Sequence, residues 1–282
     1  MLAKPMLKAS ATWFLLLAAA TAAPAQSNFF NKWEARTAAT QSKQPPWPPP
    51  LATTYVGLIQ VYRTDFSRQI SPTHVTTWNY DSSKGLNLIP WARTEFDFNL
   101  PPFITHSSPK TIDGAGDTSF LGKYRILSGN SQHGNYVVSA FVSSTIPTGS
   151  YKNGTPVATV GPGLGVGKGF GRFDVQTTLS ATLPTGETPK LGRPVAWNTA
   201  GQYHLGKYLW PELEFNATYY HGGPNDGKSQ AFMTPGLLGV HKLRPSVESS
   251  RLVLCLGGGV QIATSQFHTY NHGLLFTGRL VF

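Results

Sequence analysis

The sequence predicts an all-β protein, a single antiparallel, up-and-down transmembrane β-barrel of about twelve strands. Three observations lead to this fold class. Apolar and polar residues alternate with a period of two along many segments of strand length, which gives each strand one apolar and one polar face. Charged residues make up only 13% of the 282 residues although 40% are hydrophobic, whereas soluble domains carry about 25% charged residues. The 29 glycines and 22 prolines favour many turns over long helices.

The first 25 residues have the features of a secretory signal peptide. Lys4 and Lys8 precede an apolar core at residues 13–20, and Ala23 and Ala25 supply small residues at the spacing of a cleavage site. The core is too short to cross a bilayer as a helix, and no other stretch reaches about 18 consecutive apolar residues. We therefore expect an exported chain made of a signal peptide (1–25), a Pro-rich periplasmic lead-in (26–50) and a barrel (51–282).

The lead-in ends in residues 44–50, where five prolines surround Trp47. Proline fixes φ and lacks an amide donor, so this stretch favours polyproline II and cannot join a β-ladder. A periplasmic spacer is the expected role of such a segment. The alternative is a segment that enters the barrel mouth with Trp47 as its anchor.

The clearest alternation runs through residues 172–183, and shorter examples occupy residues 95–100 and 212–219. The expected strands are 54–66, 74–90, 93–104, 115–128, 134–147, 158–169, 172–184, 195–206, 209–221, 230–243, 250–264 and 271–282. The connections between them are mostly short on one side and longer and more polar on the other, which is the pattern of bacterial outer-membrane barrels. An even number of strands returns both ends of the chain to the periplasmic side.

The end of the chain resembles the C-terminal signal by which bacterial outer-membrane barrels are recognised for insertion. Phe276, Gly278, Leu280 and Phe282 fall on one face of the last strand. An open edge that ends in an aromatic residue invites aggregation, whereas a closed barrel in a bilayer has no edge. We therefore expect the protein in the bacterial outer membrane, with membrane lipids and the barrel-assembly machinery as partners.

Charged residues on the polar strand faces are the candidates to line the lumen. They are Glu95, Asp97, Lys123, Arg125, Asp174, Glu212, Glu214, Arg251 and Arg279. A hairpin centred near Lys110 would place Asp97 opposite Lys123. The same register would place Glu95 opposite Arg125, and opposite charges across a ladder stabilise its register. Their role is either to hold the wall together or to form a charged constriction that filters cargo.

Six glycines recur at every second position from Gly161 to Gly171. A phosphate-binding loop is not indicated, because it needs a following helix and a Gly-Lys-Ser/Thr ending. Period two instead predicts a strand with a bare inner face, and it places Leu164 and Val166 on the other face. A bare wall leaves volume for water, cargo or a neighbouring tyrosine.

No set of residues indicates catalysis, and we expect no enzyme activity, cofactor or metal. The single cysteine, Cys255, lies in an apolar strand and excludes an intramolecular disulfide. The eight histidines show no ligand spacing. His106 and Ser108 resemble the His/Ser pair of an outer-membrane phospholipase but lack that family's Asn and Arg pattern. The net charge of +10 comes from scattered Lys and Arg, so nucleic acid is not an expected partner.

The chain resembles an outer-membrane protein family named for the MetA pathway of phenol degradation. The matching pieces are residues 93–101, 114–125, 146–149, 235–239 and 257–261, and the second of them is the most specific. They cover most of the mature chain in order, and the Pro-rich lead-in is a departure from the family. The resemblance implies an outer-membrane barrel that passes small hydrophobic or aromatic compounds. The alternatives are a lipid-modifying outer-membrane hydrolase and a non-conducting structural barrel.

Overall fold

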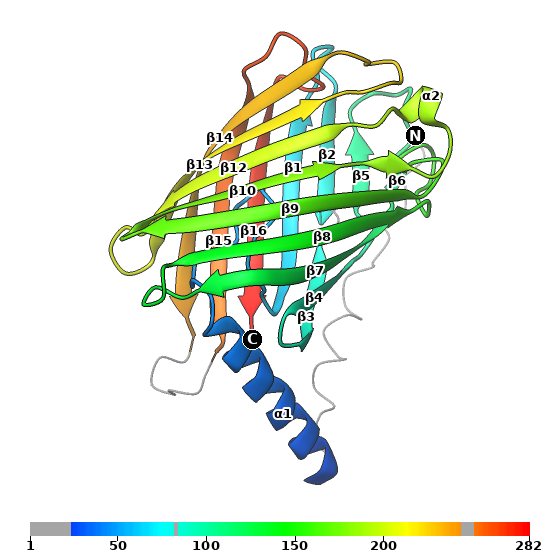
Figure 1. The fold of residues 1–282 in the computed structure, drawn as a ribbon. Coiled ribbons are helices and arrows are strands. Elements are labelled where there is room, and N and C mark those ends of the chain that lie inside the picture. Colours follow the sequence, from blue (N-terminus) through cyan, green and yellow to red (C-terminus); the bar gives the residue numbers. More distant parts are fainter. Residues whose placement is uncertain (1–23, 82–83, 244–250) are drawn as a thin grey trace, which may run out of the picture.

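The structure, a computed structural model, describes residues 24–81, 84–243 and 251–282. Its strands form one antiparallel sheet that closes on itself (Figure 1). Closure is made by β1 (Val61–Ile70) and β16 (His272–Val281), which pair from Val61 opposite Val281 to Ile70 opposite His272. The predicted barrel of twelve antiparallel strands is therefore confirmed.

Four of the twelve strands are divided into two segments by short breaks. They are β2 (Thr76–Asp81) with β3 (Gly85–Trp91), β4 (Thr94–Asn99) with β5 (Phe103–His106), β6 (Gly114–Ala115) with β7 (Thr118–Gly129), and β10 (Phe173–Ala181) with β11 (Leu183–Pro184). The remaining strands are β8 (Tyr136–Ile146), β9 (Thr159–Phe170), β12 (Val195–Tyr203), β13 (Leu209–Tyr219), β14 (Ser229–Lys242) and β15 (Val253–Ala263). Breaks in pairing do not open the cylinder, because each segment keeps a partner on at least one side.

The described residues also form two helices, α1 (Pro24–Gln41) and the short α2 (Thr188–Leu191). Within the described part of the chain, neither helix has the length and apolar character needed to cross a membrane. α1 projects from the mouth of the barrel where β1 begins and β16 ends, which we call the terminal mouth (Figure 1). α2 lies in a loop at the opposite mouth (Figure 1).

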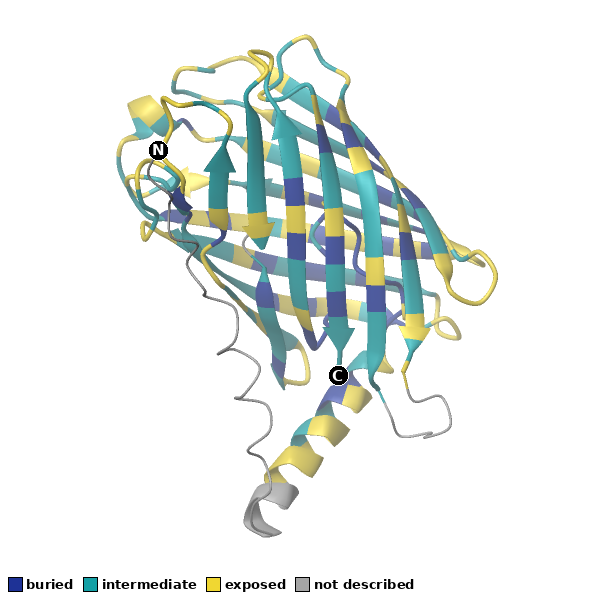
Figure 2. Ribbon diagram, turned by 180° about the vertical axis from the view of Figure 1, so that it is seen from behind, coloured by how far each residue is buried: buried dark blue, intermediate teal, exposed yellow. Residues whose placement is uncertain are grey.

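The side chains of the wall are distributed inside out compared with a soluble protein. On the outer face of β9, Leu164 is 57% exposed, whereas Arg279 on the inner face of β16 is 2% exposed. Buried and exposed positions alternate along the strands (Figure 2). An apolar exterior around a polar interior is the arrangement that a barrel needs in a bilayer.

The residues of the expected insertion signal lie on the outer face of the last strand. Phe276 is exposed, and Gly278 and Leu280 follow it at a spacing of two. Between them, Thr277 and Arg279 are buried in the interior. Phe282 comes directly after β16.

The expected register of the third hairpin is wrong by two residues. Glu95 lies opposite Lys123, and Asp97 lies opposite Leu121. The hairpin is centred on Pro109 rather than on Lys110. Moving the centre by one residue shifts each partner by two and leaves every side chain on its face. The alternation therefore could not distinguish the two registers.

The strand expected at residues 54–66 is also misplaced, because β1 begins only at Val61 and continues to Ile70. Residues 55–61 are all buried. A wall strand has one face to lipid and cannot bury consecutive side chains. The unbroken apolar character of Val56, Leu58 and Ile59 is the signal that this stretch lies inside the barrel.

A charge placed on the outer face tests the assignment of that face to lipid. Leu164 lies near the middle of β9, so Leu164→Arg should lower the free energy of unfolding by about 2–4 kcal/mol in a bilayer. Leu164→Phe is the matched control and should change it little. Urea titration of the protein folded into liposomes measures both, and equal effects of the two variants would contradict the assignment.

Candidate functional site: the filled lumen

The lumen holds a segment of the protein's own chain. Residues 44–60, which we call the lumenal segment, connect α1 to β1 and are mostly buried. Trp47 is 6% exposed, Val56 is 1% exposed and Leu58 is fully buried. Of the two roles considered for the Pro-rich stretch, the structure shows insertion, and Trp47 is one of the side chains that anchor it. The stretch is thus not an exposed spacer.

Two wall carboxylates accept the backbone amides that follow the prolines. Glu212 Oε1 accepts from the amide of Leu51 at 3.1 Å. Glu214 accepts from the amides of Ala52 at 2.8 Å and Thr53 at 2.6 Å, and from the Thr53 hydroxyl at 2.5 Å. Both side chains lie on the same face of β13 because they are two residues apart. Both are buried, so this face points into the barrel. They replace the strand partner that a segment inside a barrel does not have.

Two arginines donate hydrogen bonds to backbone carbonyls of the segment. Proline has no amide hydrogen, so a Pro-rich stretch can only accept hydrogen bonds. Arg279 donates from Nη1 to the carbonyl of Pro49 and from Nη2 to that of Pro50 at 2.8 Å. Arg63 Nη2 donates to the carbonyl of Leu51 at 2.6 Å. The charges of the wall therefore match the donors and acceptors of the segment.

A third anchor is the buried ion pair between Glu95 and Lys123, whose charged atoms are 2.7 Å apart. Glu95 Oε2 also accepts from the amide of Ile59. Lys123 Nζ donates to the carbonyl of Gly57 at 3.0 Å. The pair joins two wall strands and also holds the end of the lumenal segment.

The start of the segment is held by Arg125 and Gln44. Arg125 Nη1 donates to the carbonyl of Thr40 at 2.6 Å and to Gln44 Oε1 at 2.9 Å. Gln44 in turn exchanges two hydrogen bonds with Leu58, accepting from its amide at 3.0 Å and donating to its carbonyl at 2.8 Å. Gln44 therefore fastens the first residues of the segment to its last residues.

The lumenal segment covers the part of the bare inner face of β9 nearer the terminal mouth, whereas Gly161 and Gly163 face Ser143 and Phe141 of β8. A Cβ added to Gly167 would lie 2.6 Å from Trp47 and 2.9 Å from Val56, and one added to Gly165 would lie 2.9 Å from Val56. Gly165 and Gly167 are thus required by close approach of the segment. Water, cargo or a neighbouring tyrosine was the expected occupant, and the structure places Trp47 and Val56 against Gly165 and Gly167 instead.

The other candidate residues have weaker links to the segment. Arg251 Nη2 donates to Gln41 Oε1 at the end of α1. Asp174 is buried and accepts from Gln176 Nε2 at 3.3 Å, and its second oxygen has no partner among the described residues. Asp97 is half-buried and also has one oxygen without such a partner. Neither aspartate bonds to the segment.

Sequence reasoning missed Arg63, Gln44 and Gln202. Arg63 forms a pair with Asp65 at 2.6 Å, and Gln202 Nε2 donates to Glu212 Oε2 at 2.7 Å. The polar alternation of Arg63 and Asp65 in β1 was the available signal for the first. Gln44 carries no such signal, because it lies outside any strand.

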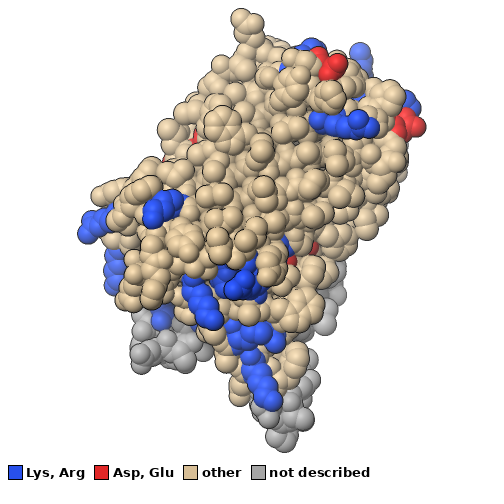
Figure 3. Space-filling model, viewed as in Figure 1, with Lys and Arg blue, Asp and Glu red and all other residues tan. Residues whose placement is uncertain are grey.

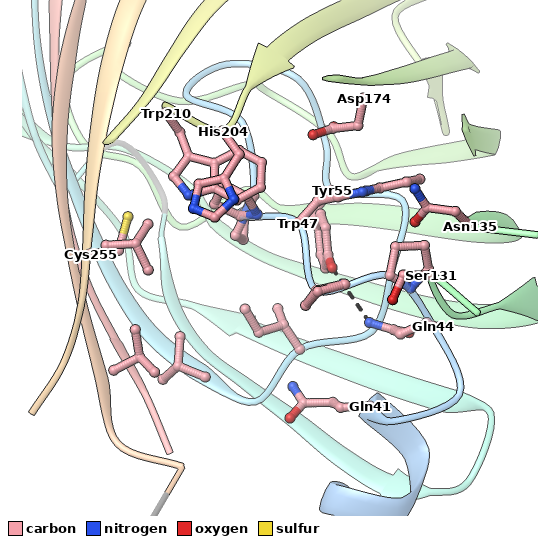
Figure 4. Close-up of a pocket in the computed structure, with 18 of the residues that line it drawn as sticks. Gln41, Gln44, Trp47, Tyr55, Ser131, Asn135, Asp174, His204, Trp210 and Cys255 are labelled. Carbon is pink, nitrogen blue, oxygen red and sulfur yellow. Dashed lines mark hydrogen bonds between the residues drawn. The ribbon is translucent and has the colours of Figure 1, made fainter. Parts of the chain in front are cut away.

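A cavity of about 600 Å³ remains beside the segment at the terminal mouth (Figure 4). Trp47 and Tyr55 line it from the segment, and His204 and Trp210 line it from the wall. The His204 and Trp210 rings are stacked with centroids 4.4 Å apart. Asp174 is the acidic side chain of the lining. The surface of this cavity, which we call the vestibule, is mostly apolar, and the cations Arg172, Lys207, Arg251 and Arg279 also line it.

The fold is shared with solved outer-membrane channels. One, described as the NanC porin in a rhombohedral crystal form, is 10% identical with a TM-score of 0.50, covering 79% of this chain and 98% of that one. Another, the COG4313 outer membrane channel from Pseudomonas putida F1, is 16% identical with a TM-score of 0.51, covering 84% and 99%. At these identities the likeness concerns the fold alone. No family model and no curated protein matches the chain, so the resemblance to the MetA-pathway family stays a prediction.

Filling the glycine face should displace the lumenal segment. Gly167→Val would collide with Trp47, so protease cleavage within residues 44–60 should become faster in the folded barrel. Trp47→Ala in the same chain should restore part of the protection by making room. Gly186→Val is the control, since a Cβ there meets only Val157 at 3.6 Å. Unchanged cleavage in Gly167→Val would contradict the close packing.

The buried ion pair should show strong coupling. Lys123→Met leaves the Glu95 carboxylate buried without its cation, and the free energy of unfolding should fall by about 3–5 kcal/mol. Adding Glu95→Gln should recover part of that loss, because an amide carries no charge to bury. A double-mutant cycle measured by urea unfolding tests this, and simple additivity of the two effects would argue against the pairing.

Proposed function

We propose that the protein is an outer-membrane channel whose lumenal segment determines which small compounds pass. The observation that carries this proposal is a closed barrel with an apolar exterior that holds its own chain inside and leaves one aromatic vestibule. Small barrels of about eight strands are filled by side chains alone. A barrel of twelve strands has more room, and here the segment occupies it.

The orientation follows from the same pattern. In outer-membrane barrels the shorter turns face the periplasm. Turns such as 92–93 and 171–172 at the terminal mouth are shorter than loops such as 147–158 at the opposite mouth. The terminal mouth, with α1 and the vestibule, would therefore face the periplasm. This orientation also suits an exported chain with an N-terminal signal peptide.

The lining of the vestibule supports a small aromatic or apolar compound as cargo. Trp47, Tyr55, Phe173 and Trp210 provide flat apolar surfaces, and aromatic rings favour offset or edge contacts with one another. Ligand sites typically combine such surfaces with a few polar groups, and Asp174, Arg172 and Lys207 are among the polar residues that line this cavity. The family resemblance in the sequence points to the same class of compound.

The hydrolase alternative has less support. His106 Nε2 lies 2.9 Å from Asn153 Oδ1, and its Nδ1 lies 3.3 Å from Thr77 Oγ1. Ser108 Oγ accepts from the amide of Lys110 at 3.3 Å. Among the described residues, the imidazole is thus not hydrogen-bonded to a serine, and a serine nucleophile needs a base within reach. Only a measurement of flux across the membrane distinguishes a non-conducting structural barrel from a channel.

Loosening the segment should increase permeation. Glu212→Ala together with Glu214→Ala removes the acceptors of the buried amides of Leu51 and Thr53 and of the part-buried amide of Ala52. Leaving a buried amide unpaired costs about 1–3 kcal/mol. In planar bilayers the double variant should conduct more ions than the parent, and liposomes should take up small phenols faster. Trp197→Ala is the control, because Trp197 is 53% exposed on the outer face.

Each outcome distinguishes the candidate functions. No flux from the parent or the double variant would favour a structural barrel and contradict the channel. Lipid hydrolysis that is lost in Ser108→Ala or His106→Ala would favour the hydrolase. Equal flux in the parent and the double variant would show that the segment does not control passage.

A further inference from the structure

A second cavity, of about 540 Å³, lies where α1 meets the rim of the terminal mouth. Its walls come from the last turns of α1, the end of β7 and the turn between β3 and β4. It is separate from the vestibule, since the two share no lining residue. Nothing in the channel function requires it.

The charge of this second cavity is one-sided. Arg36, Lys43, Arg93 and Arg125 line it, and no Asp or Glu does. None of the four forms an ion pair with another described residue, and the acidic residue of α1, Glu34, is not part of the lining. Lys and Arg gather visibly at this place, where the helix joins the barrel (Figure 3). Uncompensated cations around one hollow attract an anion.

Arg36 adds a specific sign of a missing partner. Its Nε is buried, and no described group accepts a hydrogen bond from it. Its guanidinium carbon lies 4.8 Å from the Trp33 ring, which orients the group. Guanidinium groups bind phosphate oxygens with paired, charge-assisted hydrogen bonds. An anion with several oxygens would satisfy this donor.

The second cavity is also bordered by the lipid-facing wall. Ile126 and Leu127 line it and are 39% and 57% exposed. Trp91 and Tyr124 are exposed on the outer face beside this cavity. They lie on the same face because both are paired with Thr94 across their ladders. Aromatic residues mark the interface level of outer-membrane barrels. A ligand here would thus meet cations at one end and apolar wall at the other.

The lumenal segment begins at the same place. Ser128 Oγ donates to the carbonyl of Lys43 at 2.7 Å, and Asn130 Nδ2 donates to that of Ser42 at 3.0 Å. Arg125 is already engaged by Thr40 and Gln44, so Arg36, Lys43 and Arg93 remain to bind a ligand. A ligand between α1 and the rim would brace the residues through which the chain enters the lumen.

We propose that the second cavity binds the phosphate group of an anionic glycerophospholipid from the leaflet at the terminal mouth. The cations hold the headgroup, and an acyl chain lies along Ile126 and Leu127. Basic pockets of this kind on membrane proteins select anionic headgroups. The inference rests on the proposed membrane location, and it adds a regulatory contact between that leaflet and the lumenal segment.

The test compares lipids of equal chain length on the full protein in zwitterionic detergent. Native mass spectrometry counts bound phosphatidylglycerol, phosphatidylcholine and inorganic phosphate in parallel titrations. Phosphatidylglycerol should bind best. Arg36→Gln with Arg93→Gln should weaken it by roughly tenfold or more, since each surface cation contributes appreciably to anionic-lipid binding. Lys110→Gln with Lys152→Gln, both in loops of the opposite mouth, should leave it unchanged.

Hydrogen exchange gives a second measurement. Amides of residues 40–44 should exchange more slowly when phosphatidylglycerol is added to the parent but not to the Arg36/Arg93 variant. Equal binding of phosphatidylglycerol and phosphatidylcholine would overturn the inference. Equal binding of phosphatidylglycerol by the parent and the Arg36/Arg93 variant would also overturn it. Inorganic phosphate binding as tightly as the lipid would overturn the lipid assignment. A protein that conducts but shows no lipid preference would leave the channel proposal standing, whereas one that does not insert into bilayers would refute that proposal first.

Discussion

The structure depends on the pairing of backbone groups that have no strand beside them. A chain segment inside a closed barrel cannot join the sheet, and unpaired buried amides and carbonyls are costly. The wall therefore supplies side chains in their place. Carboxylates of β13 accept from the amides after the prolines, and Arg279 donates to the proline carbonyls. The charged side chains that hold the segment would be expensive inside a barrel, and they are stabilised because each of them meets a group of opposite polarity.

The same requirement explains the unusual wall of β9. Large inner side chains would fill the lumen themselves, whereas glycines allow Trp47 and Val56 to approach the backbone. Segment and wall therefore pack as one unit. In the proposed channel, a compound would pass through the vestibule that remains or only after the segment shifts. Arg125 and Gln44 connect that segment to the rim, where the cations lie next to the lipid-facing surface.

Much of the barrel could be predicted because a strand has a period of two. Alternation identified the strands from about residue 74 onward and placed Glu212, Glu214 and Arg279 on the inner face. It could not choose the register of Glu95, since shifts by two leave every face unchanged. It also misassigned residues 54–60, where a strand was expected although Val56, Leu58 and Ile59 do not alternate with exposed polar residues.

The sequence by itself determined the wall: twelve strands, a closing edge, and the face on which each charge lies. Those properties are local, since neighbouring residues on a strand point to opposite sides wherever the strand sits. Only the tertiary structure decided what the lumen contains. The amide of Leu51 and the carboxylate of Glu212 are 161 residues apart in the chain. A Pro-rich stretch has no periodicity from which its contact partners could be predicted. Closure of the cylinder brings them together, and packing in three dimensions selects which side chains meet.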